Sequence, residues 1–371
     1  MGERMLAFAE ESLEPENDKW SLEMKNDLKI RIVEDGQYYM YGNALKDAFQ
    51  NKGFQNVKLF SWSNFMNGNN NVYKRVQNKL AFGPEIWNIN KCLVQECASY
   101  RPDLVFLYRC RIIHPATVKR IKMQGAIVFS YNNDNPFATY FRPYFWRHYR
   151  NSIKYDDATF VYRESNIREC LQKGAHQVEL LRSYYISDRN YPIKDNDKKN
   201  AKYDVVFLGH FENDDRASYI SALTSAGISV GIPNITWEGF DQQNSHLTRL
   251  NNTHKDYNKI INESKIALVF LSSLNKDTYT RRCFEIPAAK TFMLSQYTED
   301  LASMFEPDKE AVYFKTPDEL VEKAKYYLEH EEEREKIAKA GYDRLMRDGH
   351  EVGDRVQQIM EKYNEVVGEK F

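Results

Sequence analysis

The strongest constraint on the fold is an alternation of buried-strand and amphipathic-helix patterns that runs through the chain twice. The first series opens with the strand pattern "LKIRIVED" and continues through "VKLFSW", "PDLVFLYRC" and "AIVFSYNNDNP". The second contains "YDVVFLG", "ISVGI", "KIALVFLSS" and "TFMLSQ". Strands that alternate with helices form parallel sheets with right-handed crossovers and helices on both faces. The sequence therefore predicts two Rossmann-like α/β/α domains.

The length and the composition of the connecting segments suggest where the domains end. A chain of 371 residues exceeds a typical domain of about 100–200 residues, which favours two separate cores. The segment "SDRNYPIKDNDKKNAK", residues 187–202, is charged and poor in large apolar residues, as linkers are. We expect an N-terminal extension at 1–27, domains at 28–186 and 203–349, and a last helix at 350–371 that could return to the first domain.

Composition excludes several classes of protein. The 52 basic and 53 acidic residues nearly cancel, which argues against nucleic-acid binding. The 5 cysteines show no CxxC spacing, so neither a disulfide framework nor a zinc site is indicated. The chain has no apolar run long enough to span a membrane, and its acidic start is unlike a signal peptide. We expect a soluble cytoplasmic protein with at most peripheral contact with membranes.

Polar residues follow the predicted strands of the first domain, where ligands of parallel sheets gather. Asp35 follows the first strand together with Glu34 and Gly36, and Arg109 and Arg111 follow "LVFLY". The loop "YNNDNPF" contains Asn132, Asn133, Asp134 and Asn135. One interpretation of this loop is a turn, because Asn and Asp tolerate turn geometry. The other makes Asp134 a general base or a substrate-orienting group.

The stretch "YTRRCFEIPAAKTFMLSQ" places charged residues between two buried strands of the second domain. If a helix begins with Thr280 as its N-cap, Arg281 and Arg282 lie at the positive end of the helix dipole, where cations are disfavoured. A bound phosphate would reverse that balance. Glu285, about one turn later, could accept hydrogen bonds from a ribose diol. The alternative is that both arginines pair with Glu299 and Asp300.

The same segment, from Tyr279 to Gly349, resembles the carboxyl-terminal region of the CgeB-like glycosyltransferases of the GT-B class. It follows their pattern T-x-R-x-F-E-x-x-A-x-G and ends in paired helices, with departures at Pro287 and Lys290. Pro287 predicts a helix that is short or kinked after Glu285. The resemblance implies two Rossmann-like domains that face each other across a cleft, with a nucleotide-sugar donor held mainly by the second and an acceptor by the first.

The resemblance also implies roles for individual residues. Glu285 would hold the donor ribose, Arg281 would reach the diphosphate, and Thr280 and Arg282 would complete the contacts. Gly209 and His210, after "YDVVFLG", would lie under the phosphates or the sugar. We expect Asp134 to be the catalytic base, with His210, Glu34 and Asp35 as the next candidates. The residues expected on the acceptor side are Asp35, Arg109 and Asn133.

The predicted activity is metal-independent transfer of a sugar to an acceptor hydroxyl, without a cofactor. The helix end and basic side chains would neutralise the leaving diphosphate. Two other functions remain open at this point: a GT-B-type sugar-nucleotide epimerase, and a non-catalytic two-domain protein that binds sugars or nucleotides. A dehydrogenase is disfavoured because no GxGxxG follows a predicted strand.

Overall fold

The N-terminal domain is built on a six-stranded parallel sheet with the order β2-β1-β3-β4-β5-β6. The computed structural model describes residues 22–36, 39–66, 72–194, 201–238, 240 and 244–370. The strands of this sheet are β1 (Ile30–Glu34), β2 (Val57–Ser61), β3 (Leu104–Tyr108), β4 (Ile127–Asn132), β5 (Ala158–Val161) and β6 (Val178–Leu180). All residues of β1, β3 and β4 are buried, because helices cover both faces of the sheet.

Helices of the N-terminal domain divide between the two faces of its sheet. The core on one face includes α2 (Tyr39–Asn51), and the core on the other includes α4 (Pro84–Tyr100) and α5 (Pro115–Met123). Four further helices complete the domain: α1 (Leu22–Asp27), α3 (Val72–Leu80), α6 (Arg147–Ser152) and α7 (Glu164–Gln172).

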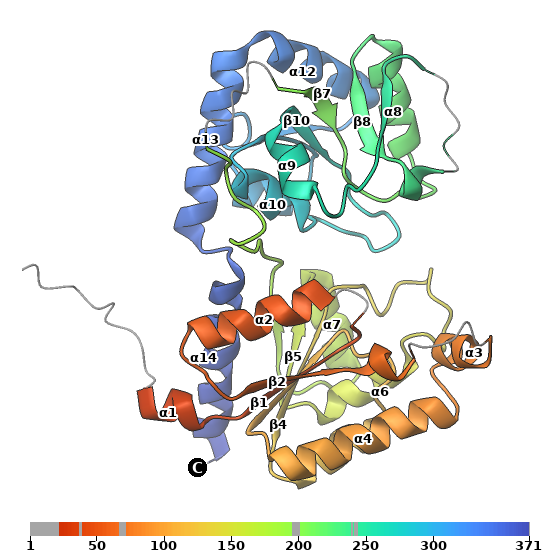
Figure 1. Ribbon diagram of the computed structural model, residues 1–371, viewed down its shortest axis with the longest axis vertical. Coiled ribbons are helices and arrows are strands. Elements are labelled where there is room, and N and C mark those ends of the chain that lie inside the picture. The colour runs from red at the N-terminus through yellow and green to blue at the C-terminus, as the bar shows by residue number, and fades with distance from the viewer. Residues whose placement is uncertain are drawn as a thin grey trace, which may run out of the picture.

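The C-terminal domain repeats this architecture with the strand order β12-β11-β10-β7-β8-β9, again with parallel pairing. Its strands are β7 (Tyr203–Val206), β8 (Val230–Pro233), β9 (Leu247–Leu250), β10 (Ser264–Val269), β11 (Phe292–Gln296) and β12 (Val312–Phe314). The two stacked α/β domains (Figure 1) confirm the predicted fold class. The two edge strands of the C-terminal sheet, β9 and β12, are short and were not predicted from the sequence.

Two groups of helices cover the second sheet. The core on one face includes α8 (Arg216–Ser225), α12 (Pro317–Glu329) and part of α13 (Glu331–Asp348). The core on the other face includes α9 (Tyr257–Asn262), α10 (Arg282–Ala288) and α11 (Glu299–Met304). This second core is continuous with the core around α2 in the N-terminal domain, so the two domains share buried apolar surface.

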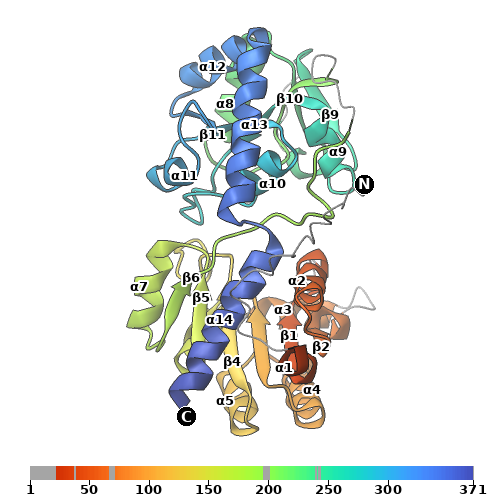
Figure 2. The ribbon, with the colours of Figure 1, turned by 90° about the vertical axis from the view of Figure 1, so that its left-hand side faces the viewer.

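The chain crosses between the domains twice, and the two crossings lie side by side (Figure 2). The backbone N–H of Tyr185 donates to the carbonyl of His350 at 3.0 Å, and the N–H of Val352 donates to the carbonyl of Tyr185 at 3.1 Å. After the second crossing, α14 (Val352–Lys370) packs against α2 of the N-terminal domain. The end of the chain therefore ties the C-terminal domain to the N-terminal one.

Acidification should destabilise this junction through His350. Burial, and secondarily Arg355, lowers the pKa of His350 from 6.5 to about 4. Between pH 6.5 and 4 the unfolded chain thus binds the proton more tightly, so stability falls as the pH falls through this window. We expect a loss of about 2 kcal/mol from this group between pH 7 and pH 5, measured by urea unfolding. His350→Gln should flatten the pH dependence, and an unchanged slope would contradict this assignment.

Candidate functional site

Three predicted residues of the N-terminal domain meet at the carboxyl edge of its sheet. The guanidinium of Arg109 lies between two carboxylates: its Nη1 is 2.5 Å from Asp35 Oδ2, and its Nε is 2.8 Å from Asp134 Oδ2. Arg109 has a φ of 54°, in the left-handed region that most side chains avoid. The backbone of the loop after β3 is therefore uncommon at Arg109, the residue whose side chain connects this loop to the loops after β1 and β4.

The remaining polar residues of this edge have mainly structural partners. Glu34 is buried and accepts hydrogen bonds from Ser61 Oγ and from the Gly36 N–H, and burial raises the pKa of Glu34. The Arg111 Nη1 donates to the carbonyl of Asn78 at 2.7 Å. Asn133 accepts from Arg163 through its carbonyl, while its buried side-chain oxygen has no hydrogen-bond partner in the described structure.

In the C-terminal domain, the loop after β7 places Gly209 and His210 at the carboxyl edge of the sheet. A Cβ on Gly209 would lie 2.2 Å from Phe207 Cζ, so only glycine fits against that ring. The Gly209 carbonyl accepts a hydrogen bond from Trp237 Nε1 at 2.8 Å, and the His210 carbonyl accepts one from Arg216 Nη1 at 2.6 Å. These contacts hold the loop and leave the His210 side chain exposed.

The helix α10 begins one residue later than predicted. Arg281, not Thr280, occupies the N-cap position, and no side chain caps the helix. Thr280 is buried and its N–H lies 3.4 Å from Cys283 Sγ, so the predicted capping role of Thr280 is wrong. The helix ends one residue after Pro287, in agreement with a short helix. Lys290 then has a φ of 53°, the conformation that glycine adopts most easily.

Arg281 and Glu285 pair with each other across one turn of α10. Arg281 Nε lies 2.9 Å from Glu285 Oε1. The Arg281 guanidinium also lies 4.2 Å from the ring centre of Tyr41 and 4.6 Å from that of Tyr184, close enough for cation–π contacts. Arg281 thus links α10 to α2 of the other domain. Pairing with Glu299 or Asp300, the alternative considered from sequence, is not found, and Asp300 pairs instead with Arg182.

Arg282 lies near Phe207 and His210, not near the tyrosines that contact Arg281. Its Nε is buried and has no hydrogen-bond partner among the described residues, and its guanidinium lies 5.4 Å from the Phe207 ring centre. Desolvation, followed by the charge of Arg282, lowers the pKa of His210. An unsatisfied buried donor is costly, which favours a ligand or water at this position.

The carboxyl edges of the two sheets are joined by contacts that the sequence analysis did not identify. Arg163, directly after β5, pairs with Asp277 after β10, with Nε 2.7 Å from Asp277 Oδ1. The Asn135 side chain donates to the carbonyl of Asn275 at 3.3 Å. The rule that picked out Arg109, a charged residue directly after a buried strand, could also have found Arg163. Burial raises the pKa of Asp277 to about 6.

Two tyrosines reinforce this contact between the domains. The rings of Tyr162 and Tyr279 stack with their centres 4.6 Å apart. The Tyr279 hydroxyl donates to the carbonyl of Tyr162 at 2.7 Å, and the Tyr162 hydroxyl donates to the carbonyl of Tyr279 at 3.3 Å, so each ring is fixed by a polar contact as well as by packing. Aromatic pairs of this kind contribute stability beyond that from the burial of their apolar area. The strand ends of the two domains are therefore held together at β5 and at the start of α10.

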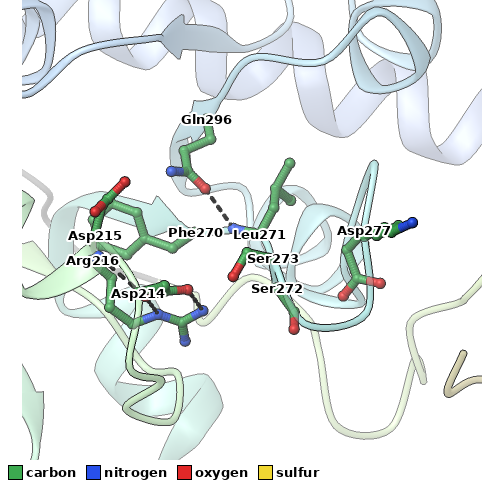
Figure 3. A pocket seen from close by; sticks show the side chains of 10 residues that line it. Asp214, Asp215, Arg216, Phe270, Leu271, Ser272, Ser273, Asp277 and Gln296 are labelled. Carbon is green, nitrogen blue, oxygen red and sulfur yellow. Dashed lines mark hydrogen bonds and ion pairs between the residues drawn. The ribbon is translucent and has the colours of Figure 1, made fainter. Parts of the chain in front are cut away.

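A pocket of about 220 Å³ lies at the carboxyl ends of β10 and β11, beside the start of α8 (Figure 3). Its charged lining includes three carboxylates, of Asp214, Asp215 and Asp277, together with Arg216 and Lys276. Arg216 binds Asp214 through its Nε at 2.7 Å. None of the predicted donor residues lines this pocket. Asp214 pairs with Arg216 and Asp277 pairs with Arg163, so the lining carries charges of both signs.

Metal ligands and membrane-spanning helices are the subject of two further expectations. In the part of the chain that the structure describes, no group of three or more His, Cys, Asp or Glu residues could hold a metal ion. Within the same residues, no helix is both long enough and apolar enough to cross a membrane. Independence from metals stays a prediction.

Comparison with solved structures identifies the architecture as GT-B, the fold of many glycosyltransferases. The sucrose-phosphate synthase of Thermosynechococcus elongatus is similar with a TM-score of 0.67 and 10% identity, over 92% of this chain and 99% of that one. Anabaena HepE in complex with UDP and glucose has a TM-score of 0.63 and 10% identity, over 91% and 99%. A Listeria monocytogenes protein assigned as a UDP-N-acetylglucosamine 2-epimerase has a TM-score of 0.53 and 10% identity, over 90% and 95%.

One part of the sequence also matches a known family. Residues 216–361, less than half of the chain, match the family model described as "Glycosyl transferase-like". The match includes all of α10 and the paired helices α12 and α13. A sequence comparison with curated proteins finds no match. The resemblance inferred from the sequence is thereby confirmed.

Proposed function

We propose that the protein is a glycosyltransferase that moves a sugar from a nucleoside-diphosphate sugar to an acceptor hydroxyl. The GT-B fold and the glycosyl transferase-like domain support this activity. The observation that carries it is the buried, unpartnered Nε of Arg282 beside His210, at the carboxyl ends of β7 and β10. β7 and β10 are neighbours in the sheet, but the helix that follows β7 lies on one face of the sheet and the helix that follows β10 lies on the other. α/β folds bind ligands at the carboxyl ends of two such strands.

Arg282 replaces Arg281 as our candidate for the diphosphate contact. Arg281 already pairs with Glu285 and lies against two tyrosine rings, whereas Arg282 has an unsatisfied donor. Arg282 also occupies the arginine position of the pattern T-x-R-x-F-E. The α10 helix is only 7 residues long, so we assign the stabilisation of the diphosphate mainly to this side chain rather than to the helix dipole.

The reaction that we propose forms a bond between the acceptor oxygen and the anomeric carbon of the sugar. The bond between that carbon and the diphosphate oxygen breaks, and the nucleoside diphosphate leaves. Arg282 and the neighbouring backbone N–H groups stabilise the charge that develops on the leaving group. Asp134 takes the proton of the acceptor hydroxyl, with Arg109 orienting the carboxylate.

Binding of nucleoside diphosphates tests the contact at Arg282. UDP, GDP, CDP and ADP should be compared by thermal shift, and we expect at least one to raise the melting temperature. Arg282→Met should weaken that ligand about 10- to 100-fold, since hydrogen bonds to charged groups contribute about 1.5–3 kcal/mol. Arg347→Met, at an exposed arginine on α13, is the matched control. No shift with any of the four nucleotides would sink the donor site.

Glu285→Gln should also weaken the same nucleotide about tenfold or more, by loss of a charged acceptor for the ribose diol. The substitution also removes the partner of Arg281, so Arg281→Met separates the two effects. If Arg281→Met binds the nucleotide normally while Glu285→Gln does not, the carboxylate itself contacts the ligand. Glu299→Gln, at an exposed acid on α11, should bind like the wild type. Isothermal titration gives the affinities.

The pocket at α8 favours a second candidate, a sugar-nucleotide epimerase. Such an enzyme needs carboxylates grouped around the sugar, and Asp214, Asp215 and Asp277 line one pocket. The fold does not separate the two activities, because the epimerase-like structure from Listeria shares it. Incubation with the bound nucleotide sugar and no acceptor distinguishes them. An epimerase inverts a stereocentre of the donor under these conditions, whereas a transferase leaves the sugar configuration unchanged.

A further inference from the structure

The helix α3 presents apolar side chains to solvent. Val72, Tyr73, Val76 and Leu80 are between 40% and 73% exposed. At the pitch of an α-helix these four positions lie within an arc of about 100°. They therefore form one continuous apolar face. The helices that cover a core direct such a face inward, but here it is directed outward.

Polar groups beside the apolar arc, at Gln77, and opposite it, at Asn78, attach α3 to the protein. Gln77 is buried, and its side-chain oxygen accepts the Glu85 N–H at 2.9 Å. Asn78 accepts two hydrogen bonds from the Arg111 guanidinium. The polar face of α3 is thus fixed by specific contacts, and the outward direction of its apolar face is a consequence of how the helix is attached.

The apolar surface continues from α3 onto the start of α4. Phe82 and Trp87 are 54% and 50% exposed, and their rings meet edge to face with centres 5.4 Å apart. Arg147 connects the two parts, because it donates to the carbonyl of Leu80 at 3.0 Å and lies 6.0 Å from the Phe82 ring centre. We call these six residues the α3 surface: Val72, Tyr73, Val76, Leu80, Phe82 and Trp87.

The charges on α3 itself are all positive, whereas Glu85, in the first turn of α4 between Phe82 and Trp87, is acidic. The helix contains Lys74, Arg75 and Lys79 and no acidic residue. Arg75 and Lys79 lie about 20–60° from the apolar arc on the helical wheel, so they flank it directly. Arg147 adds a further positive charge beside Phe82. A basic helix with a solvent-facing apolar side has the pattern of an element that lies in the interface of an anionic bilayer.

We propose that the α3 surface docks the protein onto a membrane that contains anionic phospholipids. The apolar side chains enter the interfacial region of the bilayer, and the lysines and arginines contact lipid phosphates. No membrane-spanning helix is needed for this mode of binding. The proposal does not depend on the glycosyltransferase activity, because it rests only on the exposure and charge of this surface.

Docking through this surface would bring the N-terminal domain close to the lipid. α3 lies at the outer edge of that domain (Figure 1). Arg111, which fixes Asn78 of α3, follows β3 at the carboxyl edge of the sheet, where Arg109 and Asp134 also lie. The edge to which we assign the acceptor would therefore lie beside the membrane.

Sedimentation with vesicles of phosphatidylcholine alone, and with added phosphatidylglycerol, tests this proposal on the full chain. We expect binding to the anionic vesicles, weak binding to the zwitterionic ones, and release by salt. Val72→Ser with Val76→Ser, and separately Arg75→Gln with Lys79→Gln, should each reduce the partition coefficient about tenfold or more. These side chains are exposed, so the variants should keep the wild-type melting temperature.

Matched controls sit elsewhere on the surface. Met123→Ser removes an exposed apolar side chain from α5, and Lys325→Gln with Lys336→Gln removes two exposed charges from α12 and α13. Both should bind anionic vesicles like the wild type. The proposal is overturned if the protein binds no vesicle or if the α3 variants bind normally. It is also overturned if the control variants lose as much binding as the α3 variants. It is also overturned if light scattering shows a dimer that the Val72 and Val76 substitutions dissociate, since the surface would then contact a second copy.

Discussion

Asp134→Asn should reduce the rate of sugar transfer about 10²- to 10⁴-fold, the usual contribution of a positioned general base. The amide cannot accept the proton of the acceptor hydroxyl, although it can still accept a hydrogen bond from Arg109. Nucleotide affinity should stay unchanged, because the donor contacts lie in the other domain. Transfer is measured as release of the nucleoside diphosphate with the cognate donor and acceptor, and thermal shift reports donor binding in the same preparation.

Asp35→Asn is the matched control for Asp134. Asp35 contacts the same guanidinium, with its Oδ2 2.5 Å from Arg109 Nη1, so this substitution weakens the ion-pair cluster without removing the proposed base. We expect a smaller loss of turnover than for Asp134→Asn. If Asp134→Asn keeps turnover within about twofold of the wild type, Asp134 is not the base. His210 would then be the next residue to test, because it is exposed at the edge of the facing sheet.

Arg163→Met should destabilise the protein by about 3–5 kcal/mol, the range expected when a buried ion pair loses one partner. Arg163 and Asp277 come from different domains, and their side chains are only 3% and 10% exposed. The substitution leaves the Asp277 carboxylate in a buried position without its cation. It also removes the hydrogen bond from Arg163 to the carbonyl of Asn133. Urea unfolding at pH 7.5 measures the loss.

The double variant Arg163→Met with Asp277→Leu separates the charge effect from the packing effect. A buried ion pair can often be replaced by apolar residues at little cost, so the double variant should recover part of the lost stability. Lys265→Met removes one partner of an ion pair with Asp204 that is more exposed than the Arg163–Asp277 pair. It should cost no more than about 1 kcal/mol. A similar small cost for Arg163→Met would show that its pair is not desolvated.

Hydrophobic periodicity predicted the two-sheet architecture well, for a simple physical reason. Strands such as β1, β3 and β10 are covered on both faces, so they read as apolar runs bounded by turn residues. Two edge strands were not predicted: β9, in which Thr248 is exposed, and β12, which is buried but has only 3 residues. A strand that is short or partly exposed leaves a weaker pattern in the sequence than a longer strand that is buried on both faces.

Residue types near strand ends predicted where charged groups gather, but not which charges pair. Asp35, Arg109 and Asp134 do meet, because the ends of adjacent parallel strands lie at one edge. The structure places Arg281, which was expected to reach a phosphate, against the rings of Tyr41 and Tyr184. These two rings come from parts of the chain far from α10 in sequence, so no local pattern could reveal them.

The sequence by itself therefore determined the fold class, the two parallel sheets and the short stretch around α10 that matches the glycosyl transferase-like family. Those features follow from local periodicity and from residue types at fixed spacing. Only the tertiary structure decided the roles of the two neighbouring arginines. Arg281 pairs with Glu285 and contacts the N-terminal domain, whereas the buried Nε of Arg282 has no hydrogen-bond partner among the described residues. The ion pair between Arg163 and Asp277 was likewise visible only in the structure. The reason is geometric. The way the two domains pack determines which side chain faces the other domain, and the residues that are adjacent in sequence do not determine that packing.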